Sequence, residues 1–229
     1  MKKKFEILMV ACLFISAFLL ARASAALTSS RHAASSKTCI VLDAGHGGSD
    51  PGKVGCNDAL EKDINLSIVL KLKTLFENKG YKVVLTRSDD TVPADENSRS
   101  VKVEDLRNRV KLITDTNPVM TISIHQNSYH EESVSGGQVF YYRDSAKGKA
   151  LAEILQKRFS YVLGEQNRRL PKANGNYYLL LHVKCPIVIV ECGFLSNRKE
   201  AGLLNSGEYQ DKLAYTIHMG VAEYLNGRK

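Results

Sequence analysis

The feature that most constrains the fold is an apolar run that stops at an aspartate and passes directly into a glycine-rich turn. Residues Cys39 to Leu42 are apolar, Asp43 follows them, and glycines then surround a single histidine, His46. Glycine takes positive φ without a clash at Cβ, so the pattern predicts a buried strand that ends in a sharp loop. Open α/β folds bind their ligands at the carboxyl ends of such strands, which makes His46 a candidate functional residue. Taken alone, the turn is equally compatible with a phosphate-binding loop.

Strand-like and helix-like segments alternate along the rest of the chain. Apolar residues at helical spacing predict helices over residues 64–78, 103–115, 145–163 and 209–225. Short apolar or β-branched runs predict strands over residues 38–43, 82–86, 119–124, 138–142, 177–181 and 186–190. The alternation predicts an α/β fold, in which a single domain has a central, mostly parallel twisted sheet flanked by helices.

Composition agrees with one globular domain. With 229 residues, of which 44% are hydrophobic, the chain can bury one substantial core. A charged fraction of 24% favours neither a disordered chain nor a coiled coil. Part of the formal net charge of +8 lies in the first 25 residues, so the remainder is only mildly basic and we expect no nucleic-acid partner.

The N-terminus is typical of an export signal. Lys2 to Lys4 form a positive segment, residues 7–20 are almost wholly apolar, and Ala23-Ser24-Ala25 fits a cleavage site with small residues. Residues 1–25 are therefore expected to be a signal peptide, with an uncleaved membrane anchor as the less favoured alternative. Residues 26–37, which are rich in Ser and Ala, are expected to be a tether to a domain over 38–229.

The remaining cysteines do not indicate a thiolate metal site. Cys39, Cys56, Cys185 and Cys192 form no C-x-x-C pair, so a zinc site built on cysteine is not expected. Whether any of them form a disulfide outside the cell is left open by the sequence.

Three potential metal ligands fall at comparable places in the predicted fold. His46 follows the first strand, His125 follows the strand over 119–124, and Glu61 precedes the helix over 64–78. Two imidazoles and one carboxylate are the ligands of a catalytic zinc site that leaves a fourth position for water. Each residue has a simpler interpretation, as a loop histidine or as an acidic residue at a helix start. Their joint placement favours the zinc site.

Glu191 completes the set. It comes directly after Pro-Ile-Val-Ile-Val, and burying a lone carboxylate is costly unless it is paired or functional. At the same edge of the sheet it could act as the general acid and base of a hydrolase. The simpler alternative is an ion pair with a buried arginine such as Arg87. Arg87 and Arg109 are themselves expected to be structural, binding carboxylates or loop carbonyls.

Taken together, these segments resemble a known family, the zinc-dependent N-acetylmuramoyl-L-alanine amidases of the third amidase type. The similarity runs from about Thr38 to the end of the chain, and each motif is weak alone. The matching pieces, in order, are Val41-Leu42-Asp43-Ala44-Gly45-His46-Gly47-Gly48 with Asp50-Pro51-Gly52, Glu61-Lys62-Asp63-Ile64-Asn65-Leu66, Leu85-Thr86-Arg87, Ser123-Ile124-His125-Gln126-Asn127-Ser128, and Val190-Glu191-Cys192-Gly193-Phe194-Leu195-Ser196-Asn197.

The resemblance implies both a reaction and residue roles. His46, Glu61 and His125 would bind Zn²⁺, and Glu191 would be the catalytic acid/base. The family cleaves the amide between N-acetylmuramic acid and the L-alanine of the stem peptide. Lys172-Ala173-Asn174 and residues 177–181 look like the sporulation branch, which strips spore-cortex stem peptides on the way to muramic δ-lactam.

The expected partners and location follow from this reading. The expected substrate is peptidoglycan outside the cytoplasmic membrane, in the wall or between the spore membranes, and a partner protein could activate or target the enzyme. Contact with the membrane is expected only through the N-terminal signal segment.

Two other functions remain open at this stage. The same zinc site could belong to a peptidase that cuts within the stem peptide, or the domain could be a non-catalytic wall-binding module. Shortened stem peptides among the products would indicate the peptidase.

Overall fold

The expected α/β fold is confirmed. The computed structural model describes residues 9, 12–22, 38–95, 100–163 and 167–227. Within these residues, six strands form one sheet in the order β2-β1-β3-β6-β4-β5, and only the β4–β6 pairing is antiparallel. The strands are β1 (Cys39–Ala44), β2 (Lys82–Leu85), β3 (Met120–Asn127), β4 (Gln138–Tyr142), β5 (Lys172–Asn174) and β6 (Ile187–Phe194).

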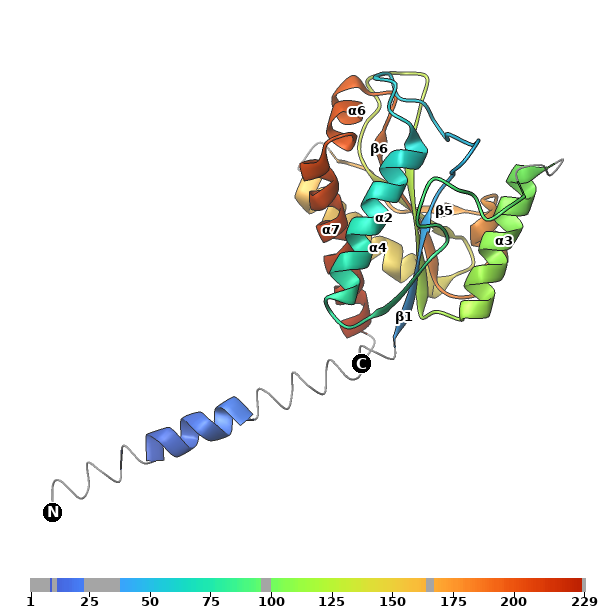
Figure 1. Cartoon of the computed structure of the whole chain (residues 1–229). Helices are drawn as coiled ribbons and strands as arrows, with labels where there is room; N and C mark the ends of the chain where they lie inside the picture. Colours follow the sequence, from blue (N-terminus) through green and yellow to red (C-terminus); the bar gives the residue numbers. More distant parts are fainter. Residues whose placement is uncertain (1–8, 10–11, 23–37, 96–99, 164–166, 228–229) are drawn as a thin grey trace, which may run out of the picture.

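Helices cover both faces of the sheet. One face carries α2, α4 and α7, which pack against one another and the strands, with α6 beside α7 (Figure 1). The other face carries α3 and α5. The bounds are α2 (Glu61–Glu77), α3 (Val101–Thr116), α4 (Ala146–Leu163), α5 (Tyr178–His182), α6 (Arg198–Leu204) and α7 (Gly207–Asn226).

Successive side chains of a central strand point to opposite faces of the sheet, and this decides which helices each side chain contacts. In β1, Ile40 and Leu42 belong to the core under α2 and α7, whereas Val41 belongs to the core under α3 and α5. Side chains on a strand alternate with a period of two, so Asp43 lies on the same face as Val41. The same parity places His125 and Glu191 on the α3 and α5 face.

The site lies where the chain reverses its direction across the sheet. From β1 the chain runs through α2 on one face to β2, and then through α3 on the opposite face to β3, on the other side of β1. Such a switch point leaves a crevice at the carboxyl ends of the two adjacent strands. His46 follows β1 and His125 lies near the end of β3, so both histidines border that crevice.

The second half of the chain differs from the sequence prediction in several places. The strand predicted over 177–181 is wrong, because this segment forms the short helix α5. The consecutive residues Leu179 and Leu180 are both buried. A short apolar run can be buried either as a strand or as a helix, so its pattern does not distinguish the two. The strand β5 and the helix α6 were not predicted, since neither has a clear apolar period. Strands β3 and β6 are also longer than predicted, so His125 and Glu191 lie inside strands rather than after them.

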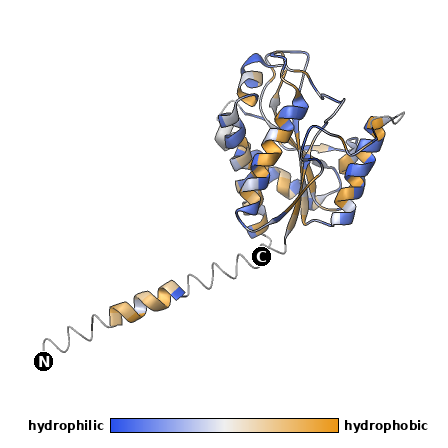
Figure 2. Ribbon diagram, in the orientation of Figure 1, coloured by the Kyte–Doolittle hydropathy of each residue, from blue (hydrophilic) through white to orange (hydrophobic). Residues whose placement is uncertain are grey.

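The N-terminal segment is only partly described. Residues 12–22 form a helix whose side chains are almost all apolar (Figure 2). In the portion of the chain that the structure describes, no helix is long and apolar enough to cross a membrane. The whole of the predicted tether over 26–37, and the predicted cleavage site, lie outside the described residues.

Candidate active site

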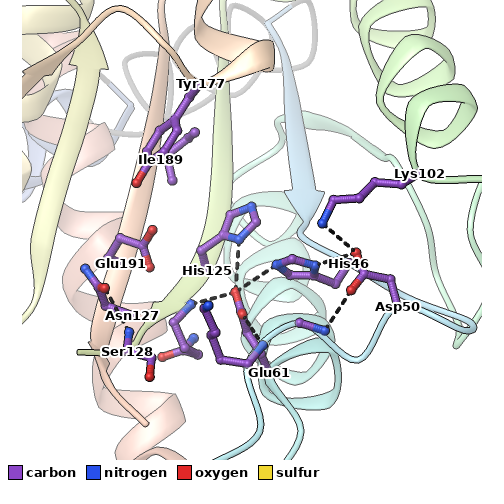
Figure 3. Close-up of a pocket in the computed structure, with 13 residues that line it drawn as sticks. His46, Asp50, Glu61, Lys102, His125, Asn127, Ser128, Tyr177, Ile189 and Glu191 are labelled. Atoms are coloured by element: carbon purple, nitrogen blue, oxygen red, sulfur yellow. Dashed lines mark hydrogen bonds and ion pairs between the residues drawn. The ribbon is translucent and has the colours of Figure 1, made fainter. Parts of the chain in front are cut away.

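The three predicted metal ligands meet in one pocket. His46, Glu61 and His125 each offer one ligand atom, and these atoms all lie within 4.8 Å of one another. The Oε1 atom of Glu61 lies between the two rings, 3.2 Å from Nε2 of His46 and 3.0 Å from Nδ1 of His125 (Figure 3). Two imidazoles and a carboxylate in this arrangement could hold a divalent metal ion.

The loop after β1 holds His46 in an unusual conformation. Its φ is 62°, in the left-handed region that L-residues rarely adopt, and Gly47 continues at 140°. The Oδ2 atom of Asp50 lies 2.9 Å from Nδ1 of His46. A hydrogen bond at Nδ1 fixes the ring and leaves Nε2 free to face Glu61. No role was predicted for Asp50, although an acidic residue four positions after a candidate ligand histidine could have indicated this contact.

Glu61 is the first residue of α2, and both of its oxygens are held by backbone amides. Its side chain is buried. Oε2 accepts a hydrogen bond from the Lys53 amide at 2.8 Å, and Oε1 accepts one from the Gln126 amide at 3.1 Å. These bonds fix a carboxylate at the start of a helix, where the helix dipole also favours negative charge.

Glu61 and His125 each favour the charged form of the other. Burial alone would lower the pKa of His125, but the hydrogen bond and charge of Glu61 outweigh burial and raise it to about 9. Burial alone would raise the pKa of Glu61, but hydrogen bonds to His125 and His46 hold it far below its usual range. Glu61 is therefore a carboxylate, the form required of a metal ligand.

Glu191 lies on β6, directly opposite His125 in the register of β3 and β6. It is only 7% exposed, and its Oε2 has no hydrogen-bond partner among the described residues. Burial raises the pKa of Glu191 to about 7, with the nearby charge of Glu61 acting in the same direction. The alternative ion pair with Arg87 is excluded, because the Arg87 guanidinium donates to backbone carbonyls such as Ala44 O and Lys62 O.

The pocket around these residues has a volume of about 420 Å³, within the range typical of small-molecule sites. Its lining includes side chains that the sequence analysis did not select, among them Lys102, Asn127, Ser128 and Tyr177. Asn127 and Ser128 follow His125 at the end of β3, whereas Lys102 belongs to α3 and Tyr177 precedes α5, so the four share no common sequence pattern. In Figure 3, Tyr177 and Glu191 lie on one side of His125, and Lys102 and Asp50 lie on the other.

The other histidines among the described residues lie outside this pocket. His130 and His182 are exposed, and His218 is buried against Phe76.

Close approach of the backbone to His125 makes Gly45 a sensitive position. A Cβ at Gly45 would overlap the His125 ring at Cε1 and Nε2. We expect Gly45→Ala to displace that ring, to lower the free energy of unfolding by ~1–3 kcal/mol and to weaken metal binding. Chemical denaturation and calorimetric metal titration measure the two effects. Gly202→Ala, where no atom lies within 4 Å of the new Cβ, is the matched control; equal behaviour of the two variants would contradict the expectation.

The comparison with known proteins decides the family. The family model described as N-acetylmuramoyl-L-alanine amidase matches residues 40–223. The chain belongs to this amidase family. The enzyme class and the fold expected from the motifs are thereby confirmed, and the peptidase and the wall-binding module are set aside.

Individual relatives agree with that assignment. The amidase is 39% identical, over 189 residues, to the germination-specific N-acetylmuramoyl-L-alanine amidase of Bacillus subtilis, covering 81% of this chain and 79% of that protein. It is 33% identical to the amidase LytC of the same organism, covering 81% of this chain but only 35% of LytC. Among solved structures, the CwlD amidase from Clostridioides difficile in complex with the GerS lipoprotein is 40% identical, with a TM-score of 0.80, covering 83% of this chain and 99% of that one.

Proposed function

We propose that this amidase is a zinc enzyme in which His46, Glu61 and His125 hold the metal and Glu191 is the acid/base. The observation that carries the proposal is the meeting of the three ligand atoms within 4.8 Å, in the pocket that Glu191 also lines. The donor set fits zinc, which accepts histidine nitrogen and carboxylate oxygen. When bound, zinc supplies a Lewis acid that polarises a carbonyl and lowers the pKa of water.

The unpartnered oxygen of Glu191 suits proton transfer. In the reaction, the Glu191 carboxylate accepts a proton from the water that attacks the lactyl carbonyl carbon. Glu191 then delivers the proton to the amide nitrogen as the C–N bond breaks. The products are a free lactyl carboxylate on the glycan and a stem peptide with a free L-alanine amino group. A carboxyl group that lacks a hydrogen-bond partner at Oε2 among the described residues can take part in both transfers, whereas an ion-paired carboxylate is held by its partner.

The substrate proposed for the enzyme is spore-cortex peptidoglycan. The support is the relative named as germination-specific, which this chain matches over 79% of that protein's length. Removal of cortex stem peptides would precede formation of muramic δ-lactam.

The proposed site of action is outside the cytoplasmic membrane. The support is the charged and apolar pattern of residues 1–25, which we propose to be a signal peptide followed by a tether over 26–37 and the catalytic domain over 38–229. An activating or targeting protein partner is also proposed, because the similar CwlD amidase is described in complex with the GerS lipoprotein.

Digestion of purified peptidoglycan tests the reaction. Cortex and vegetative-wall sacculi are incubated with the enzyme, with and without a chelator, and the products are identified by mass spectrometry. We expect intact stem peptides and peptide-free muramic acid, with greater release from cortex and none in chelator. Shortened peptides still attached to glycan would instead indicate a peptidase, and equal release from both materials would contradict the cortex assignment.

A further inference from the structure

We propose that a buried network of Asp43, Arg87 and Arg109 holds the three ligand-bearing segments in register and thereby sets the affinity for zinc. The inference rests on the proposed zinc site. None of the three residues is a proposed ligand, so each would be a positioning residue. Arg87 and Arg109 are 5% and 2% exposed, and Asp43 is 1% exposed.

The first connection is to the loop that carries His46. Arg109 donates from Nη2 to the carbonyl oxygen of His46 at 2.8 Å. Both arginines donate to the carbonyl of Ala44, and Arg87 also donates to that of Gly45 at 3.2 Å. A non-glycine residue at positive φ, such as His46, is strained and persists only where its surroundings enforce that conformation. Consecutive carbonyls fixed by two guanidinium groups supply that constraint for His46.

The second connection is to the helix that begins with Glu61. The Nη2 atom of Arg87 donates to the carbonyl of Lys62 at 2.7 Å, one residue after the proposed ligand. The same guanidinium therefore binds the His46 loop and the first turn of α2. Because its donors lie in a rigid planar fork, Arg87 fixes the distance between these two backbone segments.

The third connection is to β3. The Oδ1 atom of Asp43 accepts a hydrogen bond from Nη1 of Arg109 at 2.7 Å, and Oδ2 accepts one from the Ser123 hydroxyl. Asp43 and Ser123 are neighbours in the parallel register of β1 and β3, and His125 lies two residues further on the same face. Asp43 therefore links Arg109 to the strand that carries His125.

The charged and polar groups of the network are all paired within it or with neighbouring groups. Burial alone would raise the pKa of Asp43, but the charge of Arg109 and the Ser123 hydroxyl outweigh it and hold the pKa at about 2. Asp105 accepts a further bond from Nε of Arg109 at 2.7 Å. No polar side-chain atom of Asp43, Arg87 or Arg109 is among the unpartnered buried atoms found in the described residues. A fully satisfied network of this kind is rigid, which is what positioning requires.

Zinc affinity separates this role from a purely structural one. We compare the wild-type protein with Arg109→Lys and Ser123→Ala, measuring zinc affinity by competition with a chromophoric chelator and the Tm of the zinc-free protein. The matched control is Gln210→Leu, which removes a buried polar side chain that binds Leu204 O and Ser67 in another part of the core.

We expect about 10–100-fold weaker zinc binding for Arg109→Lys, as for other outer-shell contacts, and a smaller loss for Ser123→Ala. Gln210→Leu is expected to lower the Tm without changing zinc affinity. The inference would be overturned if folded Arg109→Lys bound zinc as tightly as the wild-type protein. It would also be overturned if Gln210→Leu lost as much zinc affinity as Arg109→Lys. If Arg109→Lys does not fold, the test rests on Ser123→Ala: weaker zinc binding than in the wild-type protein supports the inference, and wild-type zinc affinity overturns it. Failure of the wild-type protein to bind zinc would overturn the metal site itself and this inference with it.

Discussion

Replacement of Glu191 by glutamine is expected to lower kcat by about 10²–10⁴-fold while zinc remains bound. Glutamine has nearly the same shape, so the packing of this 7% exposed side chain is preserved. An amide cannot accept the proton of the attacking water, and it cannot return one to the leaving nitrogen. The loss should therefore appear in kcat rather than in KM. Turnover is followed by the release of L-alanine amino groups, and zinc content is measured by mass spectrometry of the metal.

The control for this variant is the same change at an acidic residue away from the pocket. Glu77→Gln removes a carboxylate that pairs with Lys73 at the end of α2 and is expected to retain wild-type kcat. If Glu191→Gln were as active as this control, Glu191 would not be the acid/base. If it lost zinc as well, it would belong with the metal ligands instead.

The sequence was sufficient to predict that His46, Glu61, His125 and Glu191 lie together, because most of them sit at the ends of the most regular strands of the fold. The apolar runs of β1, β3 and β6 are buried on both faces, which makes them recognisable without structural information. His46, His125 and Glu191 are polar residues at or near the carboxyl ends of these strands. Parallel strands bring such positions to one edge of a sheet, so long separations along the chain did not conceal their proximity.

Other features depend on contacts that no local pattern encodes. Residues 177–181 form the helix α5 rather than a strand, because apolar residues in a five-residue segment satisfy either periodicity. Tyr177 and Lys102 enter the pocket from elements on the α3 and α5 face, and their sequence neighbours give no sign of it. The sequence identified Arg109 as structural, but only the fold shows that it binds Asp43 and the His46 carbonyl together.

Removal of zinc should abolish activity without unfolding the protein. The Glu61 carboxylate is held by the backbone amides of Lys53 and Gln126, at 2.8 and 3.1 Å, and these bonds do not depend on a metal. We therefore expect chelation to lower activity by at least about 10³-fold, because a metal supplies several kcal/mol and each ~1.36 kcal/mol is a factor of ten. Added zinc should restore the activity and raise the Tm, since a ligand that binds only the folded state stabilises it. Circular dichroism of the chelated protein checks that the fold survives.

A variant that lacks one proposed ligand should lose activity in a way that added zinc cannot restore. His125→Ala removes one of the three proposed ligands, and we expect the same fall in activity, with no recovery and no rise in Tm on addition of zinc. His130→Ala is the matched control, because His130 is exposed, pairs with Glu131 and lies five residues further along the chain. This control should respond to zinc as the wild-type protein does. Zinc-restored activity in His125→Ala would remove His125 from the ligand set, and it would leave His46 and Glu61 as too small a set for a tetrahedral catalytic site with three protein ligands.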